Sequence, residues 1–495
     1  MYLIGYDIGS SSIKASLLDI ERNSLVVSAQ RPKTEMAIVA KHATWAEQDP
    51  ELWWKYIKEC TAELLASSKV SKSDIKAIGI AYQMHGLVLV DKDLQILRPS
   101  IIWCDSRAVE IGNEACESIG TNNCLNSLLN SPGNFTASKL AWVKRNEADI
   151  YKKVWKFMLP GDYIAMKMSG EVTSTNSGLS EGIFYDFSQE ALSTDIMNHF
   201  GFDPGVTPRI VPTFGEQAEL SKEGAAALGL EEGTKITYRA GDQPNNALSL
   251  NVLHPGELAT TAGTSGVVYA VSESLRADEL SRINSFAHVN HTKAQRRIGI
   301  LLCINGTGIL YAWARKNLNV KDYNHMNQLA ESVEIGADGL SIIPFGNGAE
   351  RILNNINLGA HISNLHLTRH GSAHILRAMK EGIAFSFKYG IDLMSDLGVN
   401  ANVMRAGHSN LFQSHIFRTT LSTVTGAKIE LYDTDGSQGA ARGAGIGLGA
   451  YDEKSAFSGL KAIDTIYPGH QDKDRTMKAY DNWKNQLEYA LSAFQ

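Results

Sequence analysis

One supersecondary pattern, a strand, a turn of small residues and a second strand, occurs twice in this chain. The first copy runs from Leu3 to Asp19 and turns at Ile8–Ser12. The second copy runs from Glu257 to Val271 and turns at Gly263–Gly266. Apolar residues on both sides of such a turn, in part alternating with polar ones, indicate a β-hairpin. The recurrence predicts an internal repeat of two domains, each of which opens with a hairpin.

Other segments follow helical and buried-strand patterns. Asp49 and Pro50 are the residue types of a helix N-cap and first helical position, and apolar residues follow them at helical spacing. Ile78–Tyr82 indicates a buried strand, whereas 375–394 and 477–494 indicate helices, the last with Phe494 facing inward. Strands that alternate with helices predict an α/β fold.

The length, charge and composition of the chain limit the classes of protein to which it can belong. With 495 residues the chain is long enough for two domains, which we place at 1–250 and 251–495. The formal net charge of −6 argues against a nucleic-acid partner. No apolar run reaches the roughly 18 residues that span a bilayer, so we expect no membrane partner. Five cysteines without a C-x-x-C pair suit a reducing compartment, and we expect a cytoplasmic protein. The sequence leaves a homodimer open.

The first hairpin turn carries residues suited to phosphate chemistry. Asp7 ends the first strand, and Ser11, Ser12 and Lys14 follow in and after the turn. Successive backbone N–H groups of such a turn form a concavity that binds anions, and the carboxylate can hold Mg²⁺ directly or through water. The alternative is an ordinary hairpin in which Asp7 caps the turn.

A second carboxylate, Asp242, follows the strand expected at Thr234–Tyr238 through a loop of small residues. A carboxylate held at a rigid strand end can serve as a general base. The alternative interpretation of the same residues is an Asx turn without a catalytic role.

Two further turns are candidates for nucleotide contacts. Gly263, Thr264 and Ser265 form the second hairpin turn and can cradle a phosphate. Gly407 and Asn410 follow another expected strand, where small residues let a planar ligand approach the backbone. Tight turns of purely structural purpose explain both segments equally well.

Two other segments are candidates for substrate contacts. Met84 and His85 follow the buried strand at Ile78–Tyr82, and ligands of α/β sheets bind beyond the carboxyl ends of strands. Trp103 and Asp105 can stack on a sugar face and hydrogen-bond its hydroxyls. The structural alternatives are a packed histidine and an ion pair beside a packed indole.

Some patterns carry less weight. His366, His370 and His374 are spaced for one helix face, but no acid of an H-E-x-x-H motif accompanies them. The glycines of Gly443–Gly449 are too dense for a dinucleotide loop and favour close helix packing. The chain has no G-x-x-x-x-G-K-[ST] motif and no G-x-S-x-G motif.

Taken in order, these motifs resemble those of the FGGY carbohydrate kinases, from residue 1 to about residue 450. The motifs are Asp7-x-Gly9, Gln83-Met-His-Gly86, Trp103-x-Asp-x-Arg107, Gly241-Asp242, Gly263-Thr-Ser-Gly266 and the 406–410 loop. Within the family, Trp45-Ala-Glu-Gln-Asp-Pro50 and the second and third motifs are similar to the branch that phosphorylates xylulose.

The resemblance implies two actin/hexokinase-like domains of the ribonuclease H type with a cleft between them. It implies a sugar kinase that uses ATP and Mg²⁺, with D-xylulose as the expected substrate. By the same resemblance, Asp242 matches the catalytic base, Asp7 the Mg²⁺ carboxylate, and Met84, His85, Trp103 and Asp105 the sugar contacts. Gly263, Thr264 and Ser265 match the phosphate loop, while Gly407 and Asn410 fall in the adenosine region.

Departures from the family pattern leave alternatives open. Ala240 replaces a usual glycine, Gln243-Pro244 replaces Asn-Ala, and Ala406-Gly407 replaces a Gly-Gly pair. The Gly-Glu-Arg-Thr-Pro segment is only partly present, as Gly348-Ala-Glu-Arg351. The alternatives are a kinase of the same family for ribulose, gluconate or glycerol, and an inactive sugar-binding protein on the same fold.

Overall fold

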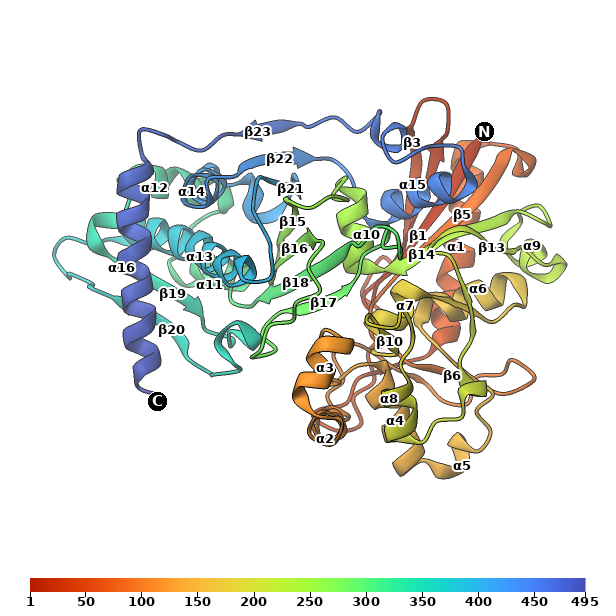
Figure 1. Cartoon of the computed structure of the whole chain (residues 1–495). Coiled ribbons are helices and arrows are strands. Elements are labelled where there is room, and N and C mark those ends of the chain that lie inside the picture. The colour runs from red at the N-terminus through yellow and green to blue at the C-terminus, as the bar shows by residue number, and fades with distance from the viewer. Residues whose placement is uncertain (495) are drawn as a thin grey trace.

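The computed structural model describes residues 1–494. Figure 1 shows two lobes, each with a β-sheet at its centre and helices around it. The six-stranded sheet of the first lobe has the strand order β13-β14-β5-β1-β2-β3, and the seven-stranded sheet of the second has the order β17-β18-β16-β15-β21-β22-β23.

The two sheets share a core of five strands with one topology. In each, an antiparallel hairpin is extended by a third antiparallel strand on one side and by two parallel strands on the other. In the first lobe these strands are β3 (Ser24–Arg31), β2 (Ile13–Asp19), β1 (Tyr2–Ile8), β5 (Ile75–Tyr82) and β14 (Lys235–Gly241). In the second they are β18 (Ile298–Ile304), β16 (Gly266–Ser272), β15 (Glu257–Ala262), β21 (Val403–Gly407) and β22 (Lys428–Tyr432). Both predicted hairpins are therefore present, and the fold is the expected two-domain α/β fold.

Alternation along β1 decides which side chains reach the site. Successive side chains of a strand point to opposite faces of the sheet. Ile4, Tyr6 and Ile8 join the core that includes Trp53 of α1 (Pro50–Ser68). Residues of the other parity face α15 (Gly436–Leu448), as Leu3 does in its cluster with Ala441 and Ala444. Asp7 shares that parity and so lies on the α15 side.

The glycine-rich helix α15 comes from the second half of the sequence but packs on the sheet of the first lobe, beside the red strands in Figure 1. The glycines permit this contact. A Cβ atom at Gly5 would lie 2.0 Å from the carbonyl oxygen of Ser437, and one at Gly447 would lie 1.9 Å from that of Thr237. The prediction of close helix packing for this segment is confirmed. The domain limits 1–250 and 251–495 stay a prediction.

Hydrogen bonds tie α15 to α10 (Asp242–Ser249), the short helix that follows β14. The Asn245 side-chain amide donates to the Gly436 carbonyl over 2.8 Å, and the Ser249 hydroxyl donates to the Asp435 carbonyl over 2.7 Å. The N-termini of both helices consequently lie close to the end of β1, which carries Asp7.

Helices cover the second sheet as well. They include α13 (Ser372–Ser395) and α14 (His415–Thr425), with α11 (Gly308–Asn317) following β18. The last helix, α16 (Lys473–Ser492), packs on α13 and α14 rather than on the sheet itself. Tyr480, Trp483 and Leu487 of α16 are buried as the helical spacing predicts. The prediction for Phe494 is wrong, because the helix ends at Ser492 and this side chain is 53% exposed.

The remaining helices and strands are the end strands β13, β17 and β23 of the two sheets, together with elements that connect these layers or form insertions. They are β4 (Glu47–Gln48), β6 (Val88–Val90), β7 (Ser100–Ile101), α2 (Val109–Ile119), α3 (Thr121–Ser127), α4 (Thr136–Asn146), α5 (Ala148–Tyr151), β8 (Lys156–Met158), α6 (Pro160–Ser169), β9 (Thr173–Thr175), α7 (Asn176–Glu181), β10 (Tyr185–Asp186), β11 (Ala191–Leu192), α8 (Thr194–Phe200), β12 (Arg209–Val211), β13 (Phe214–Glu219), α9 (Lys222–Leu228), β17 (Asn284–Ala287), α12 (Tyr323–Glu331), β19 (Ser341–Phe345), β20 (Gly359–Ser363) and β23 (Asp464–Ile466).

Among residues 1–494, no helix has the length and apolar character needed to cross a membrane. A cytoplasmic location and a homodimer stay predictions from the sequence.

Candidate active site

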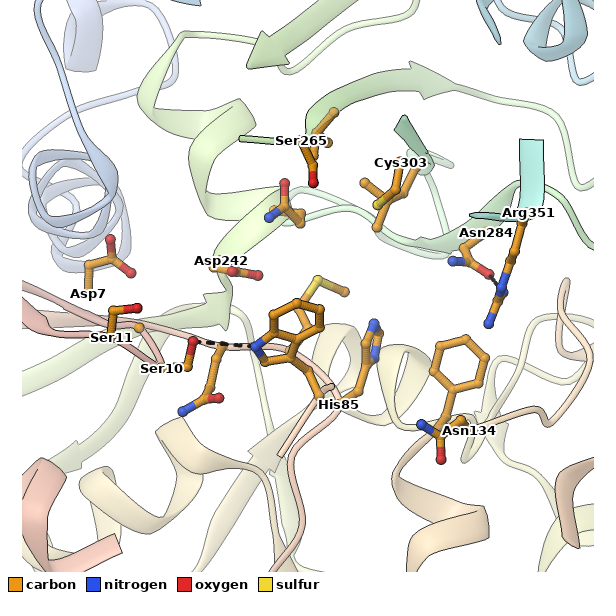
Figure 2. Close-up of a pocket in the computed structure, with 18 of the residues that line it drawn as sticks. Asp7, Ser10, Ser11, His85, Asn134, Asp242, Ser265, Asn284, Cys303 and Arg351 are labelled. Atoms are coloured by element: carbon orange, nitrogen blue, oxygen red, sulfur yellow. Dashed lines mark hydrogen bonds between the residues drawn. The ribbon is translucent and has the colours of Figure 1, made fainter. Parts of the chain in front are cut away.

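A cavity of about 550 Å³ lies between the lobes, and both halves of the sequence line it. Figure 2 shows Asp7, Ser10, Ser11 and Asp242 along one side and His85 and Asn134 along the floor, with Ser265 and Cys303 opposite. Nine of the residues singled out from the sequence line this cavity: Asp7, Ser11, Ser12, Lys14, Met84, His85, Trp103 and Asp242 from the first half of the chain, and Ser265 from the second hairpin turn. The cavity is thus bounded by both repeated hairpins.

Asp242 reaches the cavity directly from a strand end. The sequence predicted a loop after Tyr238, but β14 continues to Gly241 and α10 begins at Asp242. Pro244 fits this early start, because the first helical N–H groups have no intrahelical partner and their loss costs little. The carboxylate is held by the Met84 backbone and by Gln243. A side chain fixed at both a strand end and a helix start is rigidly placed.

The two cavity carboxylates influence each other. Burial, followed by the negative charge of Asp7, raises the pKa of Asp242 to about 7. Burial also raises the pKa of Asp7 to about 6, with Lys14 opposing and Asp435 adding to the shift. Asp7 pairs with Lys14 across the β1–β2 hairpin. Both acids therefore titrate near neutral pH, and a cation between them would favour their ionised forms.

Gly436, at the start of α15, leaves room for the Asp7 carboxylate. A Cβ atom there would lie 2.4 Å from Oδ2 of Asp7 and 3.1 Å from Oδ1 of Asn246. The described residues contain no group of three or more acidic, histidine or cysteine side chains placed to hold a metal. Mg²⁺ typically binds proteins through one or two carboxylates together with water and substrate phosphates. Asp7, a half-buried carboxylate in a fitted space beside a turn of small residues, suits that kind of ion.

His85 lies on the floor of the cavity with its ring fixed from behind. Nδ1 is 2.9 Å from the carbonyl oxygen of Glu181. Because a carbonyl only accepts, Nδ1 carries the proton, and Nε2 of the neutral ring carries a lone pair. Burial lowers the pKa of His85 to about 3, so the ring is neutral at physiological pH. Rings of Phe135 and Phe286 pack against it at centroid distances of 4.7 and 5.3 Å.

The backbone at His85 is strained into the left-handed region, with φ of 61°. Lys139 stabilises this conformation, since its ammonium donates to the His85 carbonyl over 2.8 Å and to the Ile102 carbonyl over 3.1 Å. Burial lowers the pKa of Lys139 to about 7. Strain of this kind persists only where surrounding contacts enforce it.

The structure separates Trp103 from Asp105. Trp103 lines the cavity, is 52% exposed and donates from Nε1 to the Ser10 hydroxyl over 3.4 Å. Asp105 is fully buried outside the lining, and its carboxylate accepts from the Ala46 amide over 2.6 Å and from Arg107. The ion-pair alternative describes Asp105 in this structure, and its role as a sugar contact stays a prediction that this geometry does not favour.

The second hairpin turn is fixed by α11. The Gly308 amide donates to the Gly263 carbonyl over 3.0 Å, and the Thr307 hydroxyl donates to the Gly263 and Thr264 carbonyls. Ser265 donates to Asn305 over 2.9 Å and faces the cavity. Gly263 and Thr264 lie beside the lining and not in it.

Gly407 is the last residue of β21, the parallel neighbour of β15, and Asn410 lies three residues after it. Asn410 is close to the second hairpin turn, because a Cβ atom at Gly263 would lie 3.7 Å from its side-chain nitrogen. Neither Gly407 nor Asn410 lines the cavity. The structure therefore brings the 407–410 turn and the second hairpin turn together, but at the edge of the site.

Other residues of the site were missed from the sequence. Asn284 and Arg351 line the cavity from the second lobe and are joined by a hydrogen bond of 2.6 Å. Glu181 is buried behind Gly241 and His85, and burial raises its pKa well above the ordinary value, with Asp242 adding to the shift. Asn284 is the first residue of β17 and Glu181 is the last residue of α7, and no local pattern marks either of them as a site residue.

Comparison with models of protein families identifies the family of this chain. The chain belongs to the FGGY family of carbohydrate kinases: residues 2–249 match the N-terminal domain and residues 258–451 the C-terminal domain. Kinases of this family transfer a phosphoryl group from ATP, with Mg²⁺, to a sugar hydroxyl.

Individual relatives cover the whole chain. It is 28% identical to a protein named xylulose kinase from Bacillus subtilis (strain 168), across 100% of this chain and 99% of the relative. The crystal structure of a xyloylose kinase from Brucella ovis has a TM-score of 0.89 and 26% identity, with 100% of both chains covered. A gluconate kinase from Lactobacillus acidophilus has the same TM-score at 20% identity, covers 99% of this chain and 98% of its own, and shows the fold alone.

Proposed function

We propose that this carbohydrate kinase phosphorylates D-xylulose to D-xylulose 5-phosphate, with ATP as donor. The observation that carries the choice of sugar is the similarity, along the full length of both chains, to proteins named xylulose kinase. Two other features support this choice of sugar. One is the segment around Trp45, which is similar to one in the xylulose branch of the family, and the other is the Met84-His85 pair on the cavity floor.

Asp242 is the proposed general base. A sugar hydroxyl is a poor acid, and a pKa of about 7 makes this carboxylate a stronger base than an ordinary aspartate. In the proposed step the hydroxyl oxygen bonds to the γ-phosphorus, the bond from that phosphorus to the leaving ADP oxygen breaks, and the proton passes to Asp242. Because phosphoryl transfer has a loose transition state, the base chiefly orients the hydroxyl and accepts the proton late.

The other predicted residues have proposed roles in positioning. His85 accepts a hydrogen bond from a sugar hydroxyl at Nε2, and Trp103 covers the sugar from the open side. Asp7 holds Mg²⁺, which neutralises phosphate charge when it is bound. Ser11, Ser12, Lys14 and the Gly263–Ser265 turn contact phosphates, and Gly407 and Asn410 lie near the adenosine.

A coupled assay of ADP release tests the substrate. The expected result is a kcat/KM for D-xylulose at least about tenfold above those for D-ribulose, D-gluconate and glycerol, since a site built to bond particular hydroxyls discriminates at that level or more. A preference for one of the other three would replace the proposed substrate and keep the kinase. Absence of ADP release with all four would favour the inactive binding protein. NMR of the product identifies which hydroxyl is phosphorylated.

Replacing Asp7 with Asn tests the Mg²⁺ role, because the variant keeps the size of the side chain and removes its charge. We expect a higher Mg²⁺ concentration for half-maximal rate and little change in sugar binding by calorimetry. An unchanged Mg²⁺ dependence would contradict the assignment.

A further inference from the structure

Strand β17 lies at the edge of the second lobe's sheet, yet the backbone groups on its outer side are paired. It bonds to β18 along one side only. The outer side of an edge strand presents N–H and C=O groups that lack a strand partner. Here those groups belong to Ser285 and Ala287, and they contact the first lobe.

Three polar side chains of the first lobe bind these groups. Asn130 accepts from the Ser285 amide at 3.1 Å and donates to the Ser285 carbonyl at 2.6 Å. Ser180 accepts from the Ala287 amide at 2.9 Å, and Ser177 donates to the Ala287 carbonyl at 3.1 Å. We call these four hydrogen bonds the β17 clasp.

The side chains of the β17 clasp are buried from water, so losing one of its hydrogen bonds is costly. Asn130 and Ser177 are 4% exposed and Ser180 is 2% exposed. Breaking one of the bonds without separating the surfaces would leave a buried polar group unpaired, at a cost of about 1–3 kcal/mol. The clasp therefore favours one position of β17 against the first lobe.

That position completes the wall of the cavity near His85. Alternate residues of β17 point their side chains to one face of the sheet. Asn284 lines the cavity and accepts a hydrogen bond from Arg351, while the Phe286 ring packs on the rings of His85 and Phe135. If β17 moved away from the first lobe, His85 would lose one of its two aromatic neighbours and the cavity would lose Asn284.

We propose that Asn130, Ser177 and Ser180 are positioning residues for the sugar side of the cavity. They hold β17 on the first lobe, and β17 in turn holds Asn284 and Phe286 where they enclose a substrate at His85. The inference rests on the sugar placement of the proposed function, and it adds that the second lobe contributes to sugar binding through a strand bound to the first.

Replacing Asn130 with Asp tests the clasp, because the carboxylate can still accept from the Ser285 amide but cannot donate to the Ser285 carbonyl. We expect the KM for the preferred sugar to rise by about 5- to 150-fold, the range that follows from the loss of one buried hydrogen bond. The KM for ATP should stay within about twofold. Hydrogen exchange at residues 284–287 should become faster, and saturating sugar should slow it again.

Asn23→Asp is a matched control. Asn23 is also 4% exposed and also donates to a carbonyl remote in sequence, that of Ser455 at 2.7 Å, but it does not line the cavity. This variant should lower the melting temperature while leaving the KM for the sugar unchanged. Should Asn130→Asp fail to fold, Ser177→Ala removes a single donor of the clasp and should raise the same KM less.

Two results would overturn the proposal. One is a sugar KM within about twofold of wild type in the folded clasp variant, together with a loss of melting temperature like that of the control. The other is faster exchange at 284–287 without a change in KM. If His85→Ala leaves sugar kinetics unchanged while Asn130→Asp raises the KM, the placement of the sugar at His85 fails and the clasp stands.

Discussion

Replacing Asp242 with Asn removes the proposed base and changes little else. The amide has the size of the carboxylate and can still accept from the Met84 backbone, which contacts the native side chain. Removing a positioned general base costs about 10²–10⁴ in rate. We therefore expect kcat to fall by that factor, while D-xylulose binding by calorimetry stays within a few fold.

The pH dependence of kcat/KM provides a second quantitative test of Asp242 as the base. With a pKa of about 7, the ionised fraction of Asp242 in the free enzyme rises with pH through neutrality. A base that must be ionised then gives a kcat/KM about tenfold higher at about pH 8 than at about pH 6. Mg²⁺ near Asp7 favours the ionised form and would move this limb to lower pH, so the profile is best recorded at several Mg²⁺ concentrations.

Asp186→Asn is the control, because Asp186 is an aspartate of the first lobe whose side chain is buried and bonds only within its own turn, to Ser188 and Gln189. It should keep both kcat and the pH profile. A kcat of Asp242→Asn within about tenfold of wild type would refute the assignment of the base, whatever the profile.

Three other substitutions test separate parts of the site. His85→Ala should lower kcat/KM for the preferred sugar by about 5- to 150-fold, because a buried hydroxyl loses its acceptor, and less for a deoxy analogue that lacks this hydroxyl; equal losses for all substrates with a lowered melting temperature would make His85 a packing residue. Gly436→Ala should push Asp7 aside, so that a Mg²⁺ titration shows a lower kcat and a higher Mg²⁺ concentration for half-maximal rate, and the overpacking should lower the unfolding free energy by about 1–3 kcal/mol. Gly371→Ala, where an added Cβ atom meets nothing within 4 Å, should leave both the Mg²⁺ dependence and kcat unchanged. Burial raises the pKa of Glu181 in the folded chain, which means that the folded state favours the protonated side chain. The stabilisation that this proton gives to the folded state is fully present below the unfolded pKa of about 4.3, and it is lost as the pH rises through the folded pKa. Glu181→Gln keeps a neutral side chain, and its unfolding free energy should fall less than that of wild type between about pH 5 and pH 8 in denaturant titrations; an equal fall would contradict the buried-acid argument.

Local patterns predicted much of the architecture and part of the site. The alternating hairpins, the helix capped by Asp49 and the dense glycines of α15 are all found where the sequence placed them. Each depends on neighbours within a few positions, so a single segment carries the information. The cavity likewise collects Asp7, Met84, His85 and Asp242, which the sequence marked because each lies at the end of a predicted strand or shortly after it.

For other residues the local pattern allowed more than one outcome. Asp105 sits in a motif with Trp103, but a guanidinium two residues away occupies its carboxylate. Phe494 continues a helical spacing, but its helix has already ended. Spacing tells which side of an element a residue occupies, and it does not tell whether anything covers that side.

The sequence by itself therefore determined the two-domain α/β plan, the two hairpin turns of small residues and the strand-end carboxylates, because turn chemistry and the two-residue period of strands act locally. Only the tertiary structure decided which of these meet. Packing brought Gly436 against Asp7 across more than half the chain and buried Glu181 behind His85. It also placed Asn130 on the free edge of β17. These contacts join segments that are far apart in the sequence and meet only when the two lobes pack around the cavity. Which residues meet is decided by the fit of the two surfaces and by polar backbone groups that need a hydrogen-bond partner.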